Sequence, residues 1–233
     1  MALSFVGSGT DTGGAFEAWS ITLPGGIAQN DVVYVAQTIL NTVDVDLDIA
    51  TSGYSELCDL YANDTRDAQL AVHRKVQGAT PDSTVAGSDT SASDKSATAH
   101  VWSGCDTGTP EDTATTTATA IDGGTSDPPE IITVTANAIT LAIGGTTEAD
   151  TVTNPVSGYT NLSGTAFTNQ GIWICSKSVA SPGSENPGAY SDIVGQATDS
   201  WAAATVAIRP AGGAATSILR QMLLHGLFVG SYA

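Results

Sequence analysis

The sequence predicts an all-β protein: an antiparallel β-sandwich or jelly roll built from two duplicated halves, with a short apolar segment at the C-terminus. Three observations lead to this fold class. Residues 52–57 (Ser-Gly-Tyr-Ser-Glu-Leu) recur 105 positions later as residues 157–162 (Ser-Gly-Tyr-Thr-Asn-Leu). Short runs rich in Val, Ile, Thr and Tyr alternate with clusters of Gly, Pro, Asp and Asn, which is typical of sandwiches. Helical periodicity is almost absent before residue 216.

The repeat extends beyond these six residues. Segments at 31–36, 69–75 and 96–102 resemble, in the same order, segments at 137–143, 171–177 and 200–208. This spacing is far longer than the 20–50 residues of a solenoid repeat. We therefore predict one domain over residues 1–211, with halves at about 1–112 and 128–211 and a bridge near 112–128. Duplication of this kind builds a scaffold and indicates no particular reaction.

The strands are expected in the following order. An alternating run at 18–23 stops at a Pro-Gly-Gly turn, and the continuous apolar run at 32–36 predicts a central strand. In the second half we expect strands at 130–135, 138–143, 172–175 and 203–208. Polar stretches at 80–98 and 107–125 predict long loops that contain short strands. Trp102 and Trp201 fall near equivalent repeat positions, as do Tyr54 and Tyr159, which favours core roles for these aromatic residues.

Composition and charge argue against several kinds of partner. The 24 acidic and 7 basic residues give a formal net charge of -17, which disfavours direct binding to nucleic acid or to anionic membranes. No apolar run reaches 18 residues and the N-terminus does not resemble a signal peptide, so no membrane association is expected. Three cysteines without zinc-ligand spacing predict neither a disulfide framework nor a zinc site.

No catalytic constellation is recognisable in the sequence. A Gly-x-Ser-x-Gly elbow and a phosphate-binding loop are both missing, and the three histidines, His73, His100 and His225, are scattered along the chain. We therefore expect no catalytic residues and a protein that is not an enzyme.

One acidic motif suggests a metal site. Residues 43–49 alternate strictly between apolar residues and aspartates, so Asp44, Asp46 and Asp48 would share one face of a strand. A Ca²⁺ ion would relieve their mutual repulsion, although side chains spaced along a flat strand need help from a loop to reach one ion. The alternative is an edge strand that uses charge to block pairing with other strands. No other cofactor is expected.

The C-terminal residues 212–233 differ in character from the rest of the chain. A small-residue linker leads into a segment with near-helical apolar spacing. The functional interpretation is a peptide that docks on a neighbouring subunit, and the alternative is an extra element packed on its own domain. The predicted docking residues are Ile218, Leu219, Met222, Leu223, Leu224, Leu227 and Phe228.

The segments 200–210 and 101–112, with the paired Gly-Tyr-x-x-Leu motifs, resemble a set of duplicated β-sandwich, jelly-roll-like virion-associated proteins of tailed bacteriophages and prophages. The resemblance covers roughly residues 1–211, and it departs at Ser103 and Cys105, where the pattern has a basic and an aliphatic residue. It implies a non-enzymatic virion protein, a capsid cement or decoration protein or another accessory surface subunit. Its partners would be other capsid or tail proteins, and a homo-oligomer is expected. The alternative is a tail-tip or fibre adhesin that binds host glycan.

Overall fold

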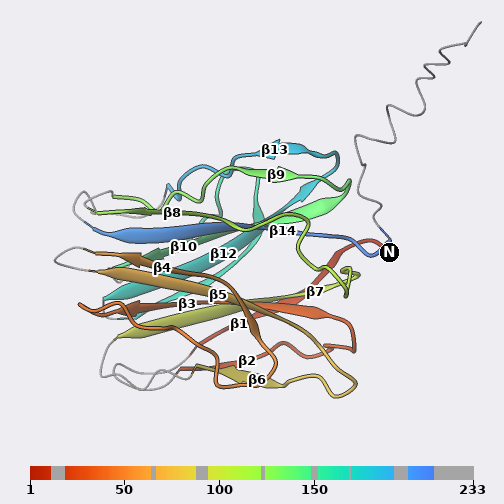
Figure 1. Ribbon diagram of the computed structural model, residues 1–233, viewed down its shortest axis with the longest axis horizontal. Helices are drawn as coiled ribbons and strands as arrows, with labels where there is room; N and C mark the ends of the chain where they lie inside the picture. Colours follow the sequence, from red (N-terminus) through yellow and green to blue (C-terminus); the bar gives the residue numbers. More distant parts are fainter. Residues whose placement is uncertain are drawn as a thin grey trace, which may run out of the picture.

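The computed structural model describes residues 1–11, 19–63, 67–87, 94–121, 124–147, 152–167, 169–191 and 199–212. These residues form an all-β structure of fourteen strands without a helix. Figure 1 shows four layers, with two large sheets at the centre and a two-stranded ribbon outside each of them. The predicted all-β sandwich is confirmed.

The first sheet and its ribbon come from the N-terminal half. The sheet has the order β1-β7-β3-β5-β4, and all neighbours in it are antiparallel. The ribbon pairs β2 with β6. The bounds of these strands are β1 (Ser4–Thr10), β2 (Ser20–Thr22), β3 (Val32–Leu40), β4 (Ser55–Ala62), β5 (Ala68–Val76), β6 (Thr84–Ala86) and β7 (Lys95–Ser103).

The second sheet and its ribbon come from the C-terminal half. The order of this sheet is β8-β14-β10-β12-β11, and its ribbon pairs β9 with β13. The bounds of these strands are β8 (Thr116–Ala120), β9 (Ile131–Thr133), β10 (Ala138–Thr146), β11 (Thr160–Phe167), β12 (Gln170–Val179), β13 (Gly183–Glu185) and β14 (Trp201–Ile208).

The duplication predicted from the sequence governs the whole topology. Each strand of the first sheet has a counterpart at the same place in the second, with β3, β4, β5, β7 and β1 matching β10, β11, β12, β14 and β8. The chain completes one sheet before it begins the other. The predicted bridge between the halves contains β8. The structure shows that β8 is not a connection but an edge strand of the second sheet.

The two sheets face each other with an approximate two-fold relation. β1 contacts β11 and β7 contacts β12, while their counterparts β8 and β14 contact β4 and β5. The shared core contains Tyr34 and Val72 from the first half and Leu141 and Ile174 from the second, all fully buried. This arrangement is that of a symmetric dimer interface formed within one chain.

Both faces of each central strand are covered, which explains its continuous apolar sequence. In β3, Val32 and Tyr34 point into the core between the sheets, whereas Val33 and Val35 pack under the β2–β6 ribbon with Trp19. Successive residues of a strand point to opposite faces, so a strand buried on both sides needs apolar residues at consecutive positions.

The expected equivalence of Trp102 and Trp201 is wrong. Trp102 pairs with Val32 at the start of β3, and the matching position in the second sheet, opposite Ile139, is Ile208. Trp201 lies at the other end of β14, opposite Thr146. Both tryptophans are buried, so the predicted core role holds for each although their positions differ.

The expected equivalence of Tyr54 and Tyr159 agrees with their surroundings. The Lys75 ammonium lies 5.4 Å from the centre of the Tyr54 ring and pairs with Asp82 at 2.7 Å. In the second half, the Lys177 ammonium lies 5.7 Å from the centre of the Tyr159 ring and pairs with Glu185 at 2.7 Å. The same group of tyrosine, lysine and acid therefore recurs in both halves.

Candidate functional site

The acidic segment at 43–49 does not form the predicted strand. Only Ile49 makes a β-bridge, to Gly87, and the residues before it have no regular structure. The alternation nevertheless survives over most of the segment, because Leu47 and Ile49 are buried while Asp44, Asp46 and Asp48 are exposed. Val43 is the exception, since 62% of its surface is exposed.

Two buried glutamine side chains fix the backbone of this irregular segment by hydrogen bonds, since its residues before Ile49 do not pair with a neighbouring strand. The side-chain amide of Gln37 donates to the Leu47 carbonyl oxygen at 2.9 Å, and that of Gln69 donates to the Val43 carbonyl oxygen at 2.8 Å. Both glutamines are almost fully buried. Because a buried backbone carbonyl must find a donor, these amides replace the hydrogen bonds that a neighbouring strand would supply.

A β-bulge in β4 places two more acids on the same side of the sheet. Glu56 pairs with His73 and Cys58 with Val72, so Leu57 is an extra residue without a partner on β5. Residues three apart in a regular strand point to opposite faces. The inserted residue shifts the phase, and Glu56 and Asp59 therefore lie opposite His73 and Ala71, which share one face of β5.

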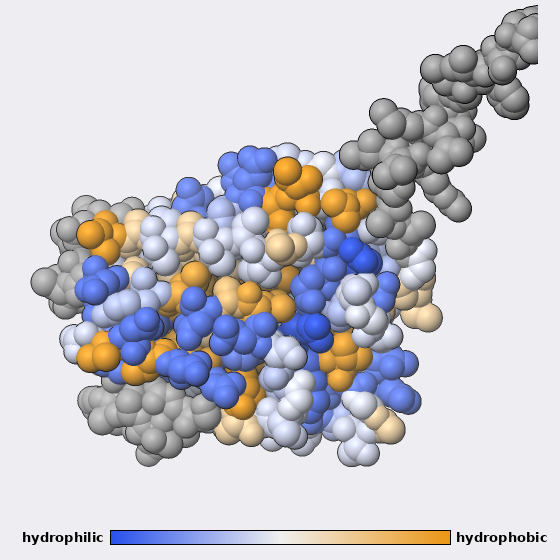
Figure 2. Space-filling model, viewed as in Figure 1, coloured by the Kyte–Doolittle hydropathy of each residue, from blue (hydrophilic) through white to orange (hydrophobic). Residues whose placement is uncertain are grey.

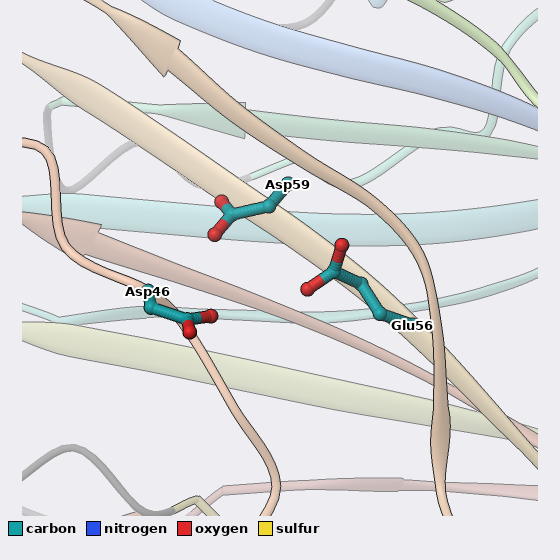
Figure 3. A group of neighbouring side chains, drawn as sticks. All are labelled: Asp46, Glu56 and Asp59. Carbon is teal, nitrogen blue, oxygen red and sulfur yellow. The ribbon is translucent and has the colours of Figure 1, made fainter.

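Three carboxylates from these two elements converge. One oxygen from each of Asp46, Glu56 and Asp59 lies within 4.8 Å of the others, and Figure 3 shows the three groups turned toward a common space. The predicted metal set of Asp44, Asp46 and Asp48 is thus corrected, because only Asp46 belongs to the group. Glu56 and Asp59 were missed because the bulge that unites them has no clear signal in the sequence.

The cluster is electrostatically unfavourable when it is empty. Burial, followed by repulsion from Glu56, Asp44 and Asp46, raises the pKa of Asp59 to about 6, although a hydrogen bond from the Leu47 amide opposes the shift. Burial and the charges of Asp46 and Asp48 also raise the pKa of Glu56. In Figure 2, hydrophilic residues gather over β4 and the segment before it.

Four basic side chains in the described part of the chain pair with acids outside this cluster. These ion pairs join Arg74 to Glu111, Lys75 to Asp82, Lys177 to Glu185 and Arg209 to Asp112. These pairs leave the carboxylates of Asp46, Glu56 and Asp59 without help from those four cations.

His73 borders the acidic cluster from beneath. Only 1% of its surface is exposed, and neither ring nitrogen has a hydrogen-bond partner among the described residues. Its Nε2 atom faces Oδ1 of Asp48 at 3.8 Å, which is too long for a hydrogen bond. Burial lowers the pKa of His73 against the opposing influence of Asp48 and Asp46.

The other histidine in the described chain has a packing role. His100 is fully buried beside the Phe5 ring, with ring centres 5.0 Å apart, and burial lowers its pKa to about 3. The three cysteines are free thiols, and burial raises the pKa of Cys58 and Cys105 to about 12. None of these groups is poised as a nucleophile or a proton carrier near neutral pH.

The predicted docking residues between Ile218 and Phe228 lie outside the described residues. The described chain ends at Gly212, which borders two hollows of about 440 and 430 Å³. The first is lined in part by Leu3, Ile139 and Pro210. No helix in the described ranges is both long enough and apolar enough to cross a membrane.

Comparison of the chain with known protein families, with characterised proteins and with solved structures finds no significant match.

Proposed function

We propose that the protein is a non-enzymatic structural subunit of a tailed-phage virion, with capsid cement or decoration as its role. The observation that supports this most is the architecture itself. Two duplicated sheets bury their inner faces against each other, and each outer face lies under a ribbon or loops. Such a body supplies rigidity, and its core is filled by side chains rather than left open for a substrate.

The aromatic residues favour this role over a glycan-binding adhesin. A sugar-binding platform needs exposed aromatic rings, but Trp19, Trp102, Trp173 and Trp201 are all buried. No Trp, Tyr or Phe in the described ranges is among the exposed large hydrophobic residues. Phe5, Tyr54, Tyr61 and Phe167 are only partly exposed, so the described surface presents no fully exposed aromatic ring to a sugar.

Attachment to neighbouring subunits is assigned to the C-terminal segment predicted from the sequence. Burial of 300–400 Å² of its apolar surface would contribute roughly 8–10 kcal/mol at ~25 cal/mol per Å², before the cost of ordering the segment. The segment leaves the described structure at Gly212, beside the two hollows at this end of the sandwich. Many such contacts on one particle would add up through multivalency.

Deletion of residues 213–233 tests this role. We expect the shortened protein to fold with the same β-rich circular dichroism spectrum and to lose incorporation into particles when it is produced with the structural proteins encoded beside it. Sedimentation of assembled particles, followed by quantification of the bound protein, provides the measurement.

A full-length variant with Leu223→Asp and Leu227→Asp provides a second test, because it keeps the chain length and removes only apolar contacts. Both variants should remain in the unbound fraction. Normal incorporation of either variant, or unfolding of the deleted form, would contradict the assignment of attachment to this segment.

A further inference from the structure

We propose that Asp46, Glu56 and Asp59 form a binding site for a hard divalent cation, with Ca²⁺ as the preferred ion. The bound ion would join the irregular segment at 43–49 to the edge strand β4. This inference stands apart from the virion role, because it depends only on residues within the described fold.

The geometry of the carboxylates suits Ca²⁺ in particular. Ca²⁺ takes oxygen ligands at about 2.3–2.6 Å, so two ligands on opposite sides of the ion are about 5 Å apart. The three carboxylate oxygens, which all lie within 4.8 Å of one another, fit around one such ion. Mg²⁺ requires shorter bonds and a strict octahedron, and zinc prefers nitrogen and sulfur ligands. Water would complete the shell, since the carboxylates reach the surface.

His73 provides a second observation, independent of the carboxylates. An imidazole that is 1% exposed and has both ring nitrogens without a hydrogen-bond partner among the described residues is costly in a folded protein. Its Nε2 atom faces Asp48, the acid next to this cluster. A hydrated cation on the cluster would bring ordered water to this side of the sheet, and such water can serve a buried polar group.

The second half of the chain has the same backbone arrangement at the matching place but no cluster of acids. β11 has a bulge at the matching place, where Thr160 pairs with Ser176 and Ser163 with Ile174. By this register, Asn161, Gly164 and Cys175 occupy the positions of Glu56, Asp59 and His73. The fold therefore does not require acids at the bulge.

The residue opposite the third ligand explains the difference between the halves. Asp59 pairs with Ala71, whereas Gly164 pairs with Trp173. A Cβ atom at position 164 would lie 2.4 Å from Cδ1 of Trp173. In the second half the tryptophan fills the space with an apolar ring, and in the first half the small Ala71 leaves it open to carboxylates.

Calcium binding to the full-length protein, stripped of metal with a chelator, tests the proposal. Isothermal titration should give one site with a Kd on the order of 10⁻⁵ to 10⁻³ M, as for calcium sites of modest affinity. Saturating Ca²⁺ should raise the melting temperature by several degrees. Mg²⁺ at equal ionic strength should give a clearly smaller shift.

Matched substitutions locate the site. Asp46→Asn, Glu56→Gln and Asp59→Asn should each weaken Ca²⁺ binding at least about tenfold, the loss expected from removing one charged ligand from a small set. Glu130→Gln removes the same charge at an exposed position outside the cluster and should bind Ca²⁺ like the unmodified protein. Melting of each variant without metal shows that it is folded.

Three results would overturn the proposal. The first is the absence of both heat and a melting shift at 10 mM Ca²⁺. The second is an equal response to Ca²⁺ and Mg²⁺, which would indicate general screening of an acidic surface. The third is unchanged Ca²⁺ affinity in the three cluster variants.

Discussion

At the scale of single residues, the side chain across the strand pair decides what a position can carry. Asp59 has room because its neighbour Ala71 is small, and Gly164 has no side chain because its neighbour is Trp173. The exchange of the small Ala71 for the large Trp173 on the neighbouring strand is therefore one reason why two halves with the same topology differ chemically at this place. The sequence repeat aligns these positions but does not reveal which of them face each other.

Replacement of Asp59 by Asn should stabilise the protein in the absence of metal. The pKa of Asp59 is raised to about 6 by burial and by neighbouring acids, so its charged form costs free energy at pH 7. After allowance for screening of a partly exposed group, we expect a gain of about 1 kcal/mol in the free energy of unfolding. Urea denaturation at pH 7 in the presence of a chelator measures this free energy. A loss of stability in the variant would show that the charge of Asp59 does not destabilise the folded protein.

His100 should make the protein sensitive to acid. Its folded-state pKa of about 3 lies below the unfolded value of about 6.5, so the folded state binds fewer protons between these values. The free energy of unfolding should therefore fall as the pH drops below about 6.5, by up to ~1.4 kcal/mol per pH unit from this group. His73 acts in the same direction.

The variant His100→Phe keeps a ring beside Phe5 and removes the titrating group. Urea denaturation of both proteins at several values between pH 7 and pH 4.5 should show a shallower slope for the variant, by up to about one proton. Parallel slopes would mean that His100 does not contribute to the acid sensitivity.

At the scale of elements, periodicity predicted the central strands well and the connections poorly. The runs at 32–36, 138–143, 172–175 and 203–208 lie within β3, β10, β12 and β14, because strands buried on both faces have an unmistakable apolar sequence. The segment at 43–49 shows the limit of this signal. Its alternation is real, but its backbone is held by Gln37 and Gln69 from other strands, and a local pattern does not report such distant partners.

The same limit applies to the candidate site. Asp46 could be predicted, since it belongs to a conspicuous acidic run. Glu56 and Asp59 could not, because they share a face only through the bulge at Leu57. Residues three apart in a regular strand point to opposite faces, and bulges follow from pairing between strands rather than from residue type alone.

A substitution at Gly164 tests whether β11 packs closely on β12. A Cβ atom there would lie 2.4 Å from the Ile172 carbonyl oxygen and from Trp173. We expect Gly164→Ala to reduce the free energy of unfolding by about 1–3 kcal/mol through overpacking. Gly78→Ala is the control, since nothing lies within 4 Å of its Cβ position. Similar melting temperatures for the two variants would contradict this account.

At the scale of the whole molecule, the two halves are expected to depend on each other. Each sheet buries one face only against the other half, with side chains such as Tyr34, Leu70, Leu141 and Ile174 fully enclosed. A fragment of residues 1–112 would expose this face to water. We therefore expect a single calorimetric transition with equal calorimetric and van't Hoff enthalpies, and an isolated first half that does not fold. Two separate transitions would show that the halves are independent domains.

The proposed role as a shell subunit is tested most directly by the number of copies per particle. If the proposal holds, the gene belongs to a phage or prophage, and its purified virions, or particles made with the proteins encoded beside it, can be analysed by quantitative mass spectrometry against a labelled standard. Hundreds of copies per particle are the result expected for a cement or decoration protein. Three to a few dozen copies would contradict the shell assignment and place the protein at the tail or a vertex, and absence from purified particles would contradict the virion role altogether.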